Sequence, residues 1–272
     1  MPDILLTGMP RSGTTLVVAL LGRQPDTIAL AEPIQLNPHG DRHRAVDEIA
    51  EFVVQTRAAA IANKPIPTKH VDGYIIDNWV EPPRQDGHLR KVLEQRSELL
   101  FDKPLSDNFT LIVKHPAEFT ALADLLVKRF TLYAIVRDPM AVMAAWQTVN
   151  MPVNRGHMPM AEAFAPELKR RLAGIKDRLV GQATLIEWQL RTYLTLPAGR
   201  VLRYEDITAE PSSALECFGT SGLMLPSLAA YDPVERYTGV DFHALYRALE
   251  PLLGLIVQFY PNFEQEWASR LG

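Results

Sequence analysis

Residues 7–15, TGMPRSGTT, decide the fold, because they join an apolar run to a helical pattern through a loop bounded by two glycines. The glycines have the separation of the phosphate-binding motif G-x-x-x-x-G-K-[ST], and Thr15 stands where that motif needs a hydroxyl. Thr14 replaces the lysine of the motif, so the cation of the loop is Arg11. Loop N–H groups and the positive end of the following helix still favour an anion. The sequence therefore predicts an oxyanion site built around an arginine.

The pattern along the chain predicts an α/β fold with a central parallel sheet flanked by helices, of the P-loop-containing nucleotide-binding type. Apolar runs predict four buried strands, at Asp3–Thr7, Thr110–Lys114, Leu132–Val136 and Val201–Tyr204. Each is followed by Gly, Pro or Asp and then by a helical pattern, at 13–23, 117–129, 140–149 and 212–218. This alternation is typical of βαβ units.

The remaining segments predict helical insertions on this platform. Residues 43–62 and 161–196 show apolar spacing near that of a helix, and 242–258 predicts a last helix at the edge. The Pro- and Gly-rich region 63–87 contains several aromatic and apolar residues, so we expect it to be ordered. We expect one domain over residues 1–272, with insertions at about 34–108 and 150–196 forming the side that binds an acceptor.

The composition limits the possible partners. The 272 residues carry a formal net charge of −4, so the overall field favours neither nucleic acid nor an anionic membrane. The single cysteine, Cys217, excludes an internal disulfide and a cysteine-based zinc site. No apolar segment is long enough to span a membrane, and the N-terminal apolar run is too short for a signal peptide. We therefore expect a cytoplasmic protein.

Ligands of parallel sheets collect at the carboxyl ends of the strands. Arg11, Lys114, Arg137 and Tyr204 all stand at or just past a predicted strand end, which makes them candidate ligands of an anion. The run LYAIVRDP places Arg137 ahead of Asp138, and a cation at that point would repel a metal ion. We therefore expect a site that neutralises a nucleotide with Arg and Lys, with no metal.

Five motifs in order resemble those of the sulfotransferase family, especially its bacterial members and the tyrosylprotein type. They are PRSGTT, a Glu-Pro pair about twenty residues on, VKHP, IVRDP and RYEDI…EP, and they cover about residues 3–220. The resemblance implies transfer of a sulfuryl group from 3′-phosphoadenosine 5′-phosphosulfate (PAPS) to a hydroxyl or amine acceptor. The acceptor itself, whether small molecule, glycan or peptide, is left open, as is the oligomeric state.

The resemblance also implies roles for the residues of these motifs. The loop would clasp the 5′-phosphosulfate, Arg137 would bind the 3′-phosphate, and Tyr204 would contact the donor. The loop residues concerned are Pro10, Arg11, Ser12, Gly13, Thr14 and Thr15. The family usually shares the 3′-phosphate with a serine eight residues after the arginine, where this chain has Ala145. Thr148, or Arg236 or Arg247 from the C-terminal segment, are candidates to replace that serine.

A catalytic base is needed to take the proton of the acceptor. Helix 13–23 leads away from the loop, and the extended residues after Pro25 can bring Glu32 back beside Arg11. In the tyrosylprotein type the glutamate at this spacing is the base, so Glu32 is the first candidate. His115 is the rival. Because neighbours along a strand point to opposite faces, we expect His115 to face away if Lys114 faces the donor and stabilises the leaving oxygen.

Two other functions remain open. The loss of the serine at Ala145 is also compatible with a catalytically degenerate nucleotide-binding module of the same fold. A P-loop small-molecule kinase, with Arg11 standing in for the lysine, is the less favoured alternative.

Overall fold

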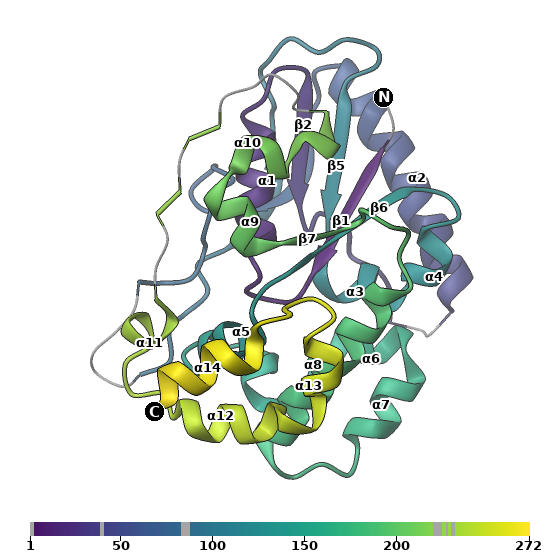
Figure 1. Cartoon of the computed structure of the whole chain (residues 1–272). Coiled ribbons are helices and arrows are strands. Elements are labelled where there is room, and N and C mark those ends of the chain that lie inside the picture. The colour runs from purple at the N-terminus through teal and green to yellow at the C-terminus, as the bar shows by residue number, and fades with distance from the viewer. Residues whose placement is uncertain (1–2, 39–40, 83–87, 220–224, 227, 230–231) are drawn as a thin grey trace.

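The computed structural model describes residues 3–38, 41–82, 88–219, 225–226, 228–229 and 232–272 (Figure 1). A five-stranded sheet in the order β2-β5-β1-β6-β7 forms its centre, and every neighbouring pair in it is parallel. The predicted α/β fold with a central parallel sheet is therefore confirmed. The five strands are β1 (Ile4–Gly8), β2 (Thr27–Ala31), β5 (Thr110–Lys114), β6 (Thr131–Val136) and β7 (Val201–Arg203).

The sheet separates two apolar cores, because side chains along each strand alternate between its faces. Leu5 and Val113 belong to the larger core, whereas Leu6 and Ile112 belong to the smaller one. β1, β2 and β5 are buried along their whole length. This explains why their sequences are continuous apolar runs, which is typical of strands covered on both faces.

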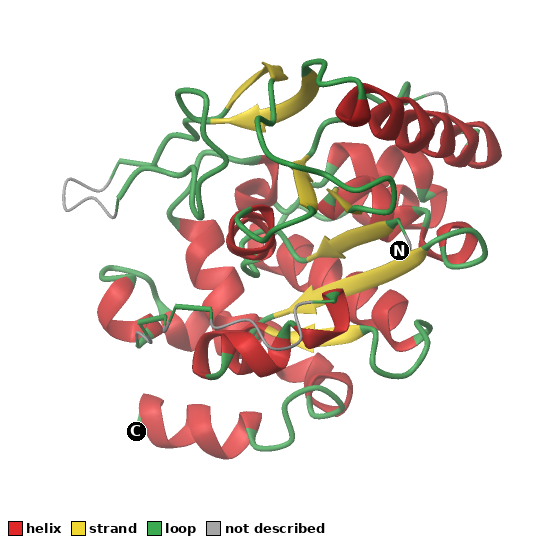
Figure 2. Ribbon diagram, turned by 90° about the horizontal axis from the view of Figure 1, so that it is seen from above, coloured by secondary structure: helices red, strands yellow, loops and turns green. Residues whose placement is uncertain are grey.

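Helices cover both faces of the sheet, as the view from above shows (Figure 2). They are α1 (Thr14–Gly22), α2 (Arg42–Ile61), α3 (Pro116–Ala121), α4 (Ala123–Leu126), α5 (Pro139–Gln147), α6 (Pro159–Phe164), α7 (Pro166–Leu172), α8 (Arg178–Leu194), α9 (Tyr204–Ala209), α10 (Pro211–Ala214), α11 (Pro233–Arg236), α12 (Phe242–Leu249), α13 (Leu253–Ile256) and α14 (Phe263–Leu271). Three 3-10 turns, η1 (Pro152–Arg155), η2 (Glu216–Phe218) and η3 (Glu250–Leu252), lie between them. The C-terminal helices gather beside α5 and α8 (Figure 1).

A second, two-stranded antiparallel sheet was not predicted. β3 (Ile66–His70) pairs with β4 (Gln95–Leu99), and both lie in the insertion that follows β2. The Oγ1 atom of Thr68 accepts a hydrogen bond of 3.0 Å from the backbone N–H of Ala31. This contact holds the small sheet against the end of β2, directly beside Glu32.

Several predicted boundaries are wrong, for local reasons. The predicted helix 117–129 is split into α3 and α4 at Leu122. The predicted segment 161–196 contains three helices, and the prolines at 159 and 166 begin two of them, as expected for a residue that lacks an N–H group. Tyr204 begins α9 instead of ending β7. Part of the predicted ordered region 63–87, residues 83–87, lies outside the described residues.

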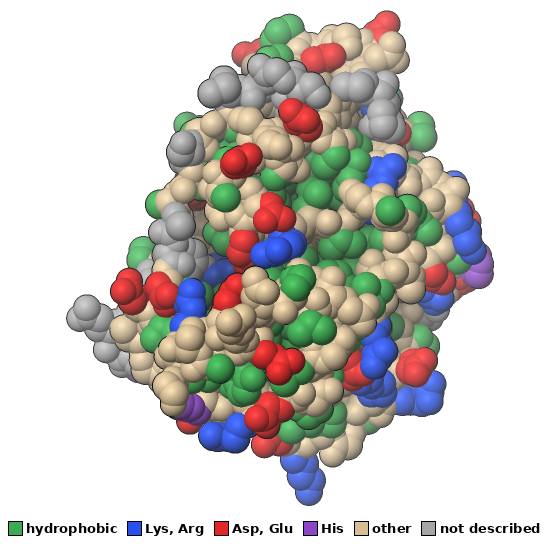
Figure 3. Space-filling view, in the orientation of Figure 1, with side chains coloured by type: hydrophobic (Ala, Val, Ile, Leu, Met, Phe, Trp, Pro, Cys, Tyr) green, Lys and Arg blue, Asp and Glu red, His purple; other side chains and the backbone are tan. Residues whose placement is uncertain are grey.

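The surface carries charges of both signs. On the face shown in Figure 3, Lys and Arg side chains are interspersed with Asp and Glu side chains, in keeping with the small net charge of −4. None of the helices in the described part of the chain combines the length and apolar character required to cross a membrane.

Replacing Gly8 with alanine is expected to lower the free energy of unfolding by roughly 1–3 kcal/mol. Gly8 has a φ of +154°, and an added Cβ would lie 2.5 Å from the carbonyl oxygen of Ile135 on the neighbouring strand. Gly174→Ala is the matched control, because a Cβ there meets no atom within 4 Å. Urea unfolding measures both variants, and equal stabilities would contradict the close approach of β1 to β6.

Candidate active site

The loop between β1 and α1 keeps the first turn of the helix open. Gly13, with a φ of 92°, is the N-cap residue of α1 and has no side chain that can bond the first N–H groups. These N–H groups have no partner within a helix, so they can bind an anion. Ser12 differs from the prediction: its N–H donates to the carbonyl oxygen of Met9 at 2.9 Å, and its Oγ donates to that of Ile135 at 2.9 Å. Ser12 therefore shapes the loop, and the binding face comprises its neighbours.

Arg11 is held in an unusual backbone conformation. Its φ is 72°, and its Nη1 donates a 3.1 Å hydrogen bond to the Oδ1 of Asn78. Among the described residues, the non-glycine residues with positive φ are Arg11, Glu32, two aspartates and one asparagine. Asp and Asn tolerate this region through local hydrogen bonds, whereas Arg and Glu do so at a cost. The strain thus falls on the two residues that the sequence singles out as chemically active.

Tyr204 connects the loop to the end of β6. Its ring lies so close to Gly13 that an added Cβ would be 2.4 Å from the ring carbon Cδ2. The guanidinium carbon of Arg137 lies 4.8 Å from the centre of the same ring. The Nη1 of Arg137 also donates to the carbonyl oxygen of Arg11 at 2.9 Å. The structure therefore brings Arg11, Gly13, Arg137 and Tyr204 together, although they come from three separate motifs.

Glu32 bridges two lysines. Its Oε1 lies 2.6 Å from the Nζ of Lys114, and its Oε2 lies 2.6 Å from the Nζ of Lys69. Burial alone would raise the pKa of Glu32, but Lys114 and then Lys69 outweigh it and hold that pKa well below the ordinary value. The Lys114 side chain is 2% exposed, and its burial lowers its own pKa. Glu32 is thus ionised and neutralised by both lysines.

The lysines also face an aromatic ring and a hydroxyl of the loop helix. The Nζ atoms of Lys114 and Lys69 lie 4.6 and 5.7 Å from the centre of the Trp79 ring, within the range of a cation–π interaction. The Nζ of Lys114 also donates a 3.3 Å hydrogen bond to the Oγ1 of Thr15. Lys114 therefore links the predicted base to the predicted anion loop.

His115 lies in the same cavity as Glu32, so the prediction that it faces away is wrong. The alternation of strand residues does not apply, because β5 ends at Lys114 and His115 is the N-cap residue of α3. Its Nε2 accepts a 3.1 Å hydrogen bond from the N–H of Ile34, and its Nδ1 lies 3.3 Å from the Oε2 of Glu118. Because this Nε2 already accepts a hydrogen bond from the backbone, it is not available to take the proton of the acceptor substrate.

Four arginines converge on Tyr237. Burial opposes ionisation of its hydroxyl, but Arg137, Arg11, Arg236 and Arg90 together lower the pKa of Tyr237 below its ordinary value. For Arg11, burial and the neighbouring arginines lower the pKa to about 10, and Tyr237 partly opposes this change. Arg11 therefore remains charged at neutral pH. Such a concentration of positive charge is suited to an anion with more than one negative charge.

Arg90 contacts Thr148, three residues after the position at which the sequence lacks the expected serine. Ala145 is fully buried in α5 and does not line the cavity, so it is not a binding residue. The hydroxyl of Thr148 donates to the carbonyl oxygen of Ala145 at 2.9 Å and accepts a 2.6 Å hydrogen bond from the Nη2 of Arg90. Thr148 is therefore committed to orienting an arginine that is itself 2% exposed.

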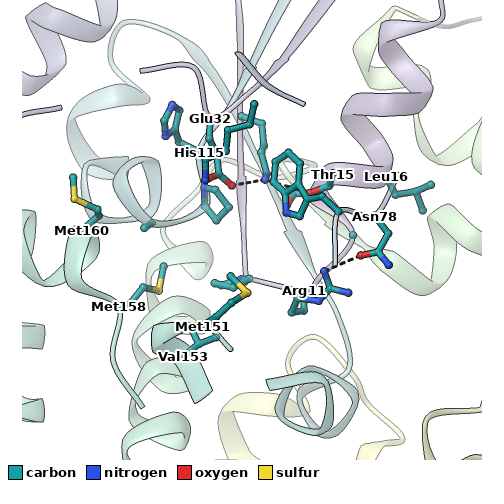
Figure 4. Close-up of a pocket in the computed structure, with 18 of the residues that line it drawn as sticks. Arg11, Thr15, Leu16, Glu32, Asn78, His115, Met151, Val153, Met158 and Met160 are labelled. Atoms are coloured by element: carbon teal, nitrogen blue, oxygen red, sulfur yellow. Dashed lines mark hydrogen bonds and ion pairs between the residues drawn. The ribbon is translucent and has the colours of Figure 1, made fainter. Parts of the chain in front are cut away.

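These groups surround one cavity of about 660 Å³ (Figure 4). Of the predicted residues, those that line it are Pro10, Arg11, Gly13, Thr14, Thr15, Glu32, Lys114, His115, Arg137 and Tyr204. Arg236 and Tyr237 line both this cavity and an adjoining one of about 530 Å³, which Arg90 also lines, whereas Arg247 lies on the surface. Among the described residues no group of three or more His, Cys, Asp or Glu side chains is arranged to hold a metal ion.

Sequence reasoning missed four contributors: Lys69, Asn78, Arg90 and Tyr237. None of them belongs to a recognised motif, and each reaches the site through tertiary packing. A weak signal existed for Lys69, because IPTKH alternates as a half-buried strand does. Tyr237 is adjacent to Arg236, which the sequence had already marked as a candidate.

The chain belongs to the sulfotransferase family. The sequence profile described as "Sulfotransferase family" matches residues 2–217, which is more than half of the chain. The match includes the loop, Glu32, Lys114, Arg137 and Tyr204. No curated protein sequence matches the chain.

Three solved structures are similar to the chain. The sulfotransferase domain from the curacin biosynthetic pathway is 13% identical, with a TM-score of 0.41 over 89% of this chain and 80% of that one. The sulfotransferase domain from the Synechococcus PCC 7002 olefin synthase is 16% identical, with a TM-score of 0.39 over 89% and 78%. Sulfotransferase STF1 from Mycobacterium tuberculosis H37Rv is 11% identical, with a TM-score of 0.40 over 92% and 76%.

Replacing Lys69 with methionine is expected to reduce the acid sensitivity of the fold. Because the pKa of Glu32 is lowered from 4.5, its charge stabilises the folded protein above that pH, and the stabilisation is lost as the pH falls. Without Lys69 the pKa of Glu32 rises toward its ordinary value, so less stability is lost on acidification.

Urea unfolding, followed from about pH 6 down to the lowest pH at which both proteins fold, measures that loss, which should be smaller in the variant than in the wild type. The difference should grow toward the acid end, because the pKa of Glu32 in the wild type lies well below its ordinary value. Lys64→Met, at an exposed position, is the control. The same acid sensitivity in both variants would contradict the ion pair.

Proposed function

We propose that the protein transfers a sulfuryl group from PAPS to a hydroxyl acceptor by in-line displacement. The observation that carries the proposal is one cavity lined by the open N-terminus of α1, by Lys114 and by Arg11, Arg137 and Arg236. A nucleotide phosphorylated at both the 5′ and 3′ ends of its ribose has two anionic groups that these cations can neutralise. ATP and GTP lack the 3′-phosphate.

The loop region fits the 5′-phosphosulfate. The open first turn of α1 offers N–H groups and the helix dipole to the phosphate. Lys114 lies 3.3 Å from the Thr15 hydroxyl and can reach an oxygen bound there. These groups are fixed before the donor binds, so they stabilise charge on the bridging oxygen without reorganisation.

The region around Tyr237 fits the 3′-phosphate. Arg137 is the residue that the family resemblance assigns to this phosphate, and Arg236 lines the cavity beside it. Arg90 lines the adjoining cavity, and we assign it a supporting part, in which it adds positive charge beside Tyr237.

The chemical step follows from these positions. The acceptor oxygen attacks sulfur while the carboxylate of Glu32 takes its proton. The bond between sulfur and the bridging oxygen breaks, and its electron pair remains on adenosine 3′,5′-bisphosphate, where Arg11, Lys114 and the loop N–H groups neutralise it. As in phosphoryl transfer, positioning and electrostatics supply most of the rate.

Glu32 is a weak base while both lysines hold it, because its pKa is far from the operating pH. The donor changes this balance. When a sulfuryl or phosphate oxygen attracts Lys114, Glu32 loses one of its two cations and its pKa rises. The base is then activated only when the donor is in place, which limits nonproductive proton transfer.

The two alternatives predict different behaviour. A degenerate module would bind adenosine 3′,5′-bisphosphate and consume no PAPS with any acceptor. A kinase would need a metal to hold ATP, and Glu32, one of the carboxylates that line the cavity, is already neutralised by two lysines.

Glu32→Gln is expected to lower the turnover of PAPS by at least roughly 100-fold, the usual contribution of a general base. Binding of adenosine 3′,5′-bisphosphate, measured by calorimetry, should persist and shows that the variant is folded. Glu94→Gln makes the same change at the other carboxylate that contacts Lys69, at 3.2 Å, and does not line the cavity. Wild-type turnover in Glu32→Gln would remove Glu32 as the base.

Arg90→Met is expected to weaken binding of adenosine 3′,5′-bisphosphate by up to about tenfold, because it removes one of the four positive charges around Tyr237. Binding of ADP, which lacks the 3′-phosphate, should change much less. Arg247→Met, at an exposed position, is the control variant, and Arg90→Lys should recover part of the loss. Equal weakening for both nucleotides would show that Arg90 supports the fold instead of the 3′-phosphate.

A further inference from the structure

The cavity has a second wall that the donor does not explain. It is formed by apolar side chains from two segments that follow α5, together with the chain after Glu32. Its principal members are Ile34, Leu36, Met151, Val153, Met158 and Met160. In Figure 4, Met158 and Met160 lie on the opposite side of Glu32 and His115 from Arg11 and Asn78. Glu32 thus stands between the cationic part of the cavity and this apolar wall.

The wall is held rigidly from behind. The Nε2 of Gln182 donates to the carbonyl oxygens of Val153 and Asn154 at 2.9 and 3.0 Å, and the Nδ2 of Asn154 donates to that of Trp146 at 2.7 Å. Gln182 is fully buried on α8. Buried polar side chains that are fully engaged in this way fix the backbone of η1. The apolar surface is therefore present before any acceptor binds.

Two histidines beside the wall are engaged with other groups of the protein. His115 is bonded to the N–H of Ile34 and lies 3.3 Å from Glu118, and the Nδ1 of His157 lies 3.2 Å from the Oε1 of Glu162. A sugar placed here would bury several hydroxyls against thioethers and aliphatic carbons, and each unpaired hydroxyl is costly. A hydrocarbon chain would leave no polar group unpaired, and it would contact the methionines, whose unbranched side chains adapt to its shape.

From this wall we infer that the acceptor is an apolar alcohol, whose hydroxyl meets Glu32 and whose hydrocarbon body lies on the methionines. The inference rests on the proposed sulfuryl transfer and adds the class of acceptor. Glu32 supplies the proton acceptor that an alkyl hydroxyl needs, since such a hydroxyl does not ionise at neutral pH.

The test compares acceptors that share a primary hydroxyl. The wild-type protein is given PAPS with linear 1-alkanols of increasing length and, separately, with methyl glucoside, and formation of adenosine 3′,5′-bisphosphate is followed. The kcat/KM should rise roughly fourfold for each methylene that reaches the wall, the rate equivalent of burying one such group. Methyl glucoside should react far more slowly than the longer alkanols. A flat dependence on chain length, a faster reaction of the glucoside, or no transfer to any alkanol would overturn the inference.

A matched pair of variants locates the effect. Met160→Gln keeps nearly the same shape but adds a polar amide, and Met160→Leu keeps the apolar character. The glutamine variant should reduce the gain per methylene, and the leucine variant should preserve it. If the two variants show the same dependence on chain length as each other, the wall does not bind the alkyl chain.

Failure of this inference is distinguishable from failure of the proposed function. Calorimetric binding of adenosine 3′,5′-bisphosphate does not depend on Met160 and should be unchanged in both variants. If the nucleotide binds and PAPS is consumed with the glucoside alone, sulfuryl transfer stands and the acceptor class is wrong. If the nucleotide does not bind at all, the proposed function fails as well.

Discussion

The carboxylate of Glu32, held between Lys114 and Lys69, is the interaction on which the site depends. It joins the ends of β2 and β5 to β3 of the insertion, because each of the three residues comes from a different strand or strand end. A buried lysine without such a partner would lose its charge, since removal from water penalises the ionised form. The ion pairs therefore keep a cation in the cavity, and they also hold the insertion in place over the anion loop.

The arginines of the cavity have the opposite effect, because they concentrate positive charge instead of neutralising it. Arg11, Arg90, Arg137 and Arg236 concentrate positive charge at Tyr237, and the lowered pKa of Tyr237 and of Arg11 both reflect it. Mutual repulsion of this kind costs folding energy, and an anion bound there would relieve it. The cavity thus combines one carboxylate that is neutralised within the protein with a cationic region that a ligand neutralises. In the proposed mechanism, proton transfer to Glu32 and charge stabilisation by the arginines are separated in space but share Lys114.

The sequence could predict the parts of the fold and site that depend on local patterns. The apolar runs ending at Lys114 and Val136 and the glycines around Arg11 require only neighbours along the chain, and the parallel sheet follows from their alternation with helices. The antiparallel pair β3 and β4 could not be predicted, because four of the five residues of β4 are exposed and its sequence, QRSEL, has no apolar run. Its stability comes from docking against Ala31, which is a tertiary contact.

The same limit applies to single residues. Glu32, Lys114 and Arg137, which the family motifs singled out, all line one cavity. Ala145, in contrast, is buried away from the cavity, and the motif could not indicate that Arg90, 55 positions earlier in the chain, contacts Thr148 on the next turn. The argument from strand alternation failed for His115, because β5 ends at Lys114.

The central claim is that the cavity is built for a nucleotide with phosphates at both ends of its ribose and needs no metal. Isothermal titration of the wild-type protein with adenosine 3′,5′-bisphosphate, ADP and ATP, each with and without Mg²⁺, tests it most directly. The account predicts that the bisphosphate binds at least about tenfold more tightly than ADP, the contribution of one charged hydrogen bond, and that Mg²⁺ has no effect. Equal or tighter binding of Mg-ATP would contradict it.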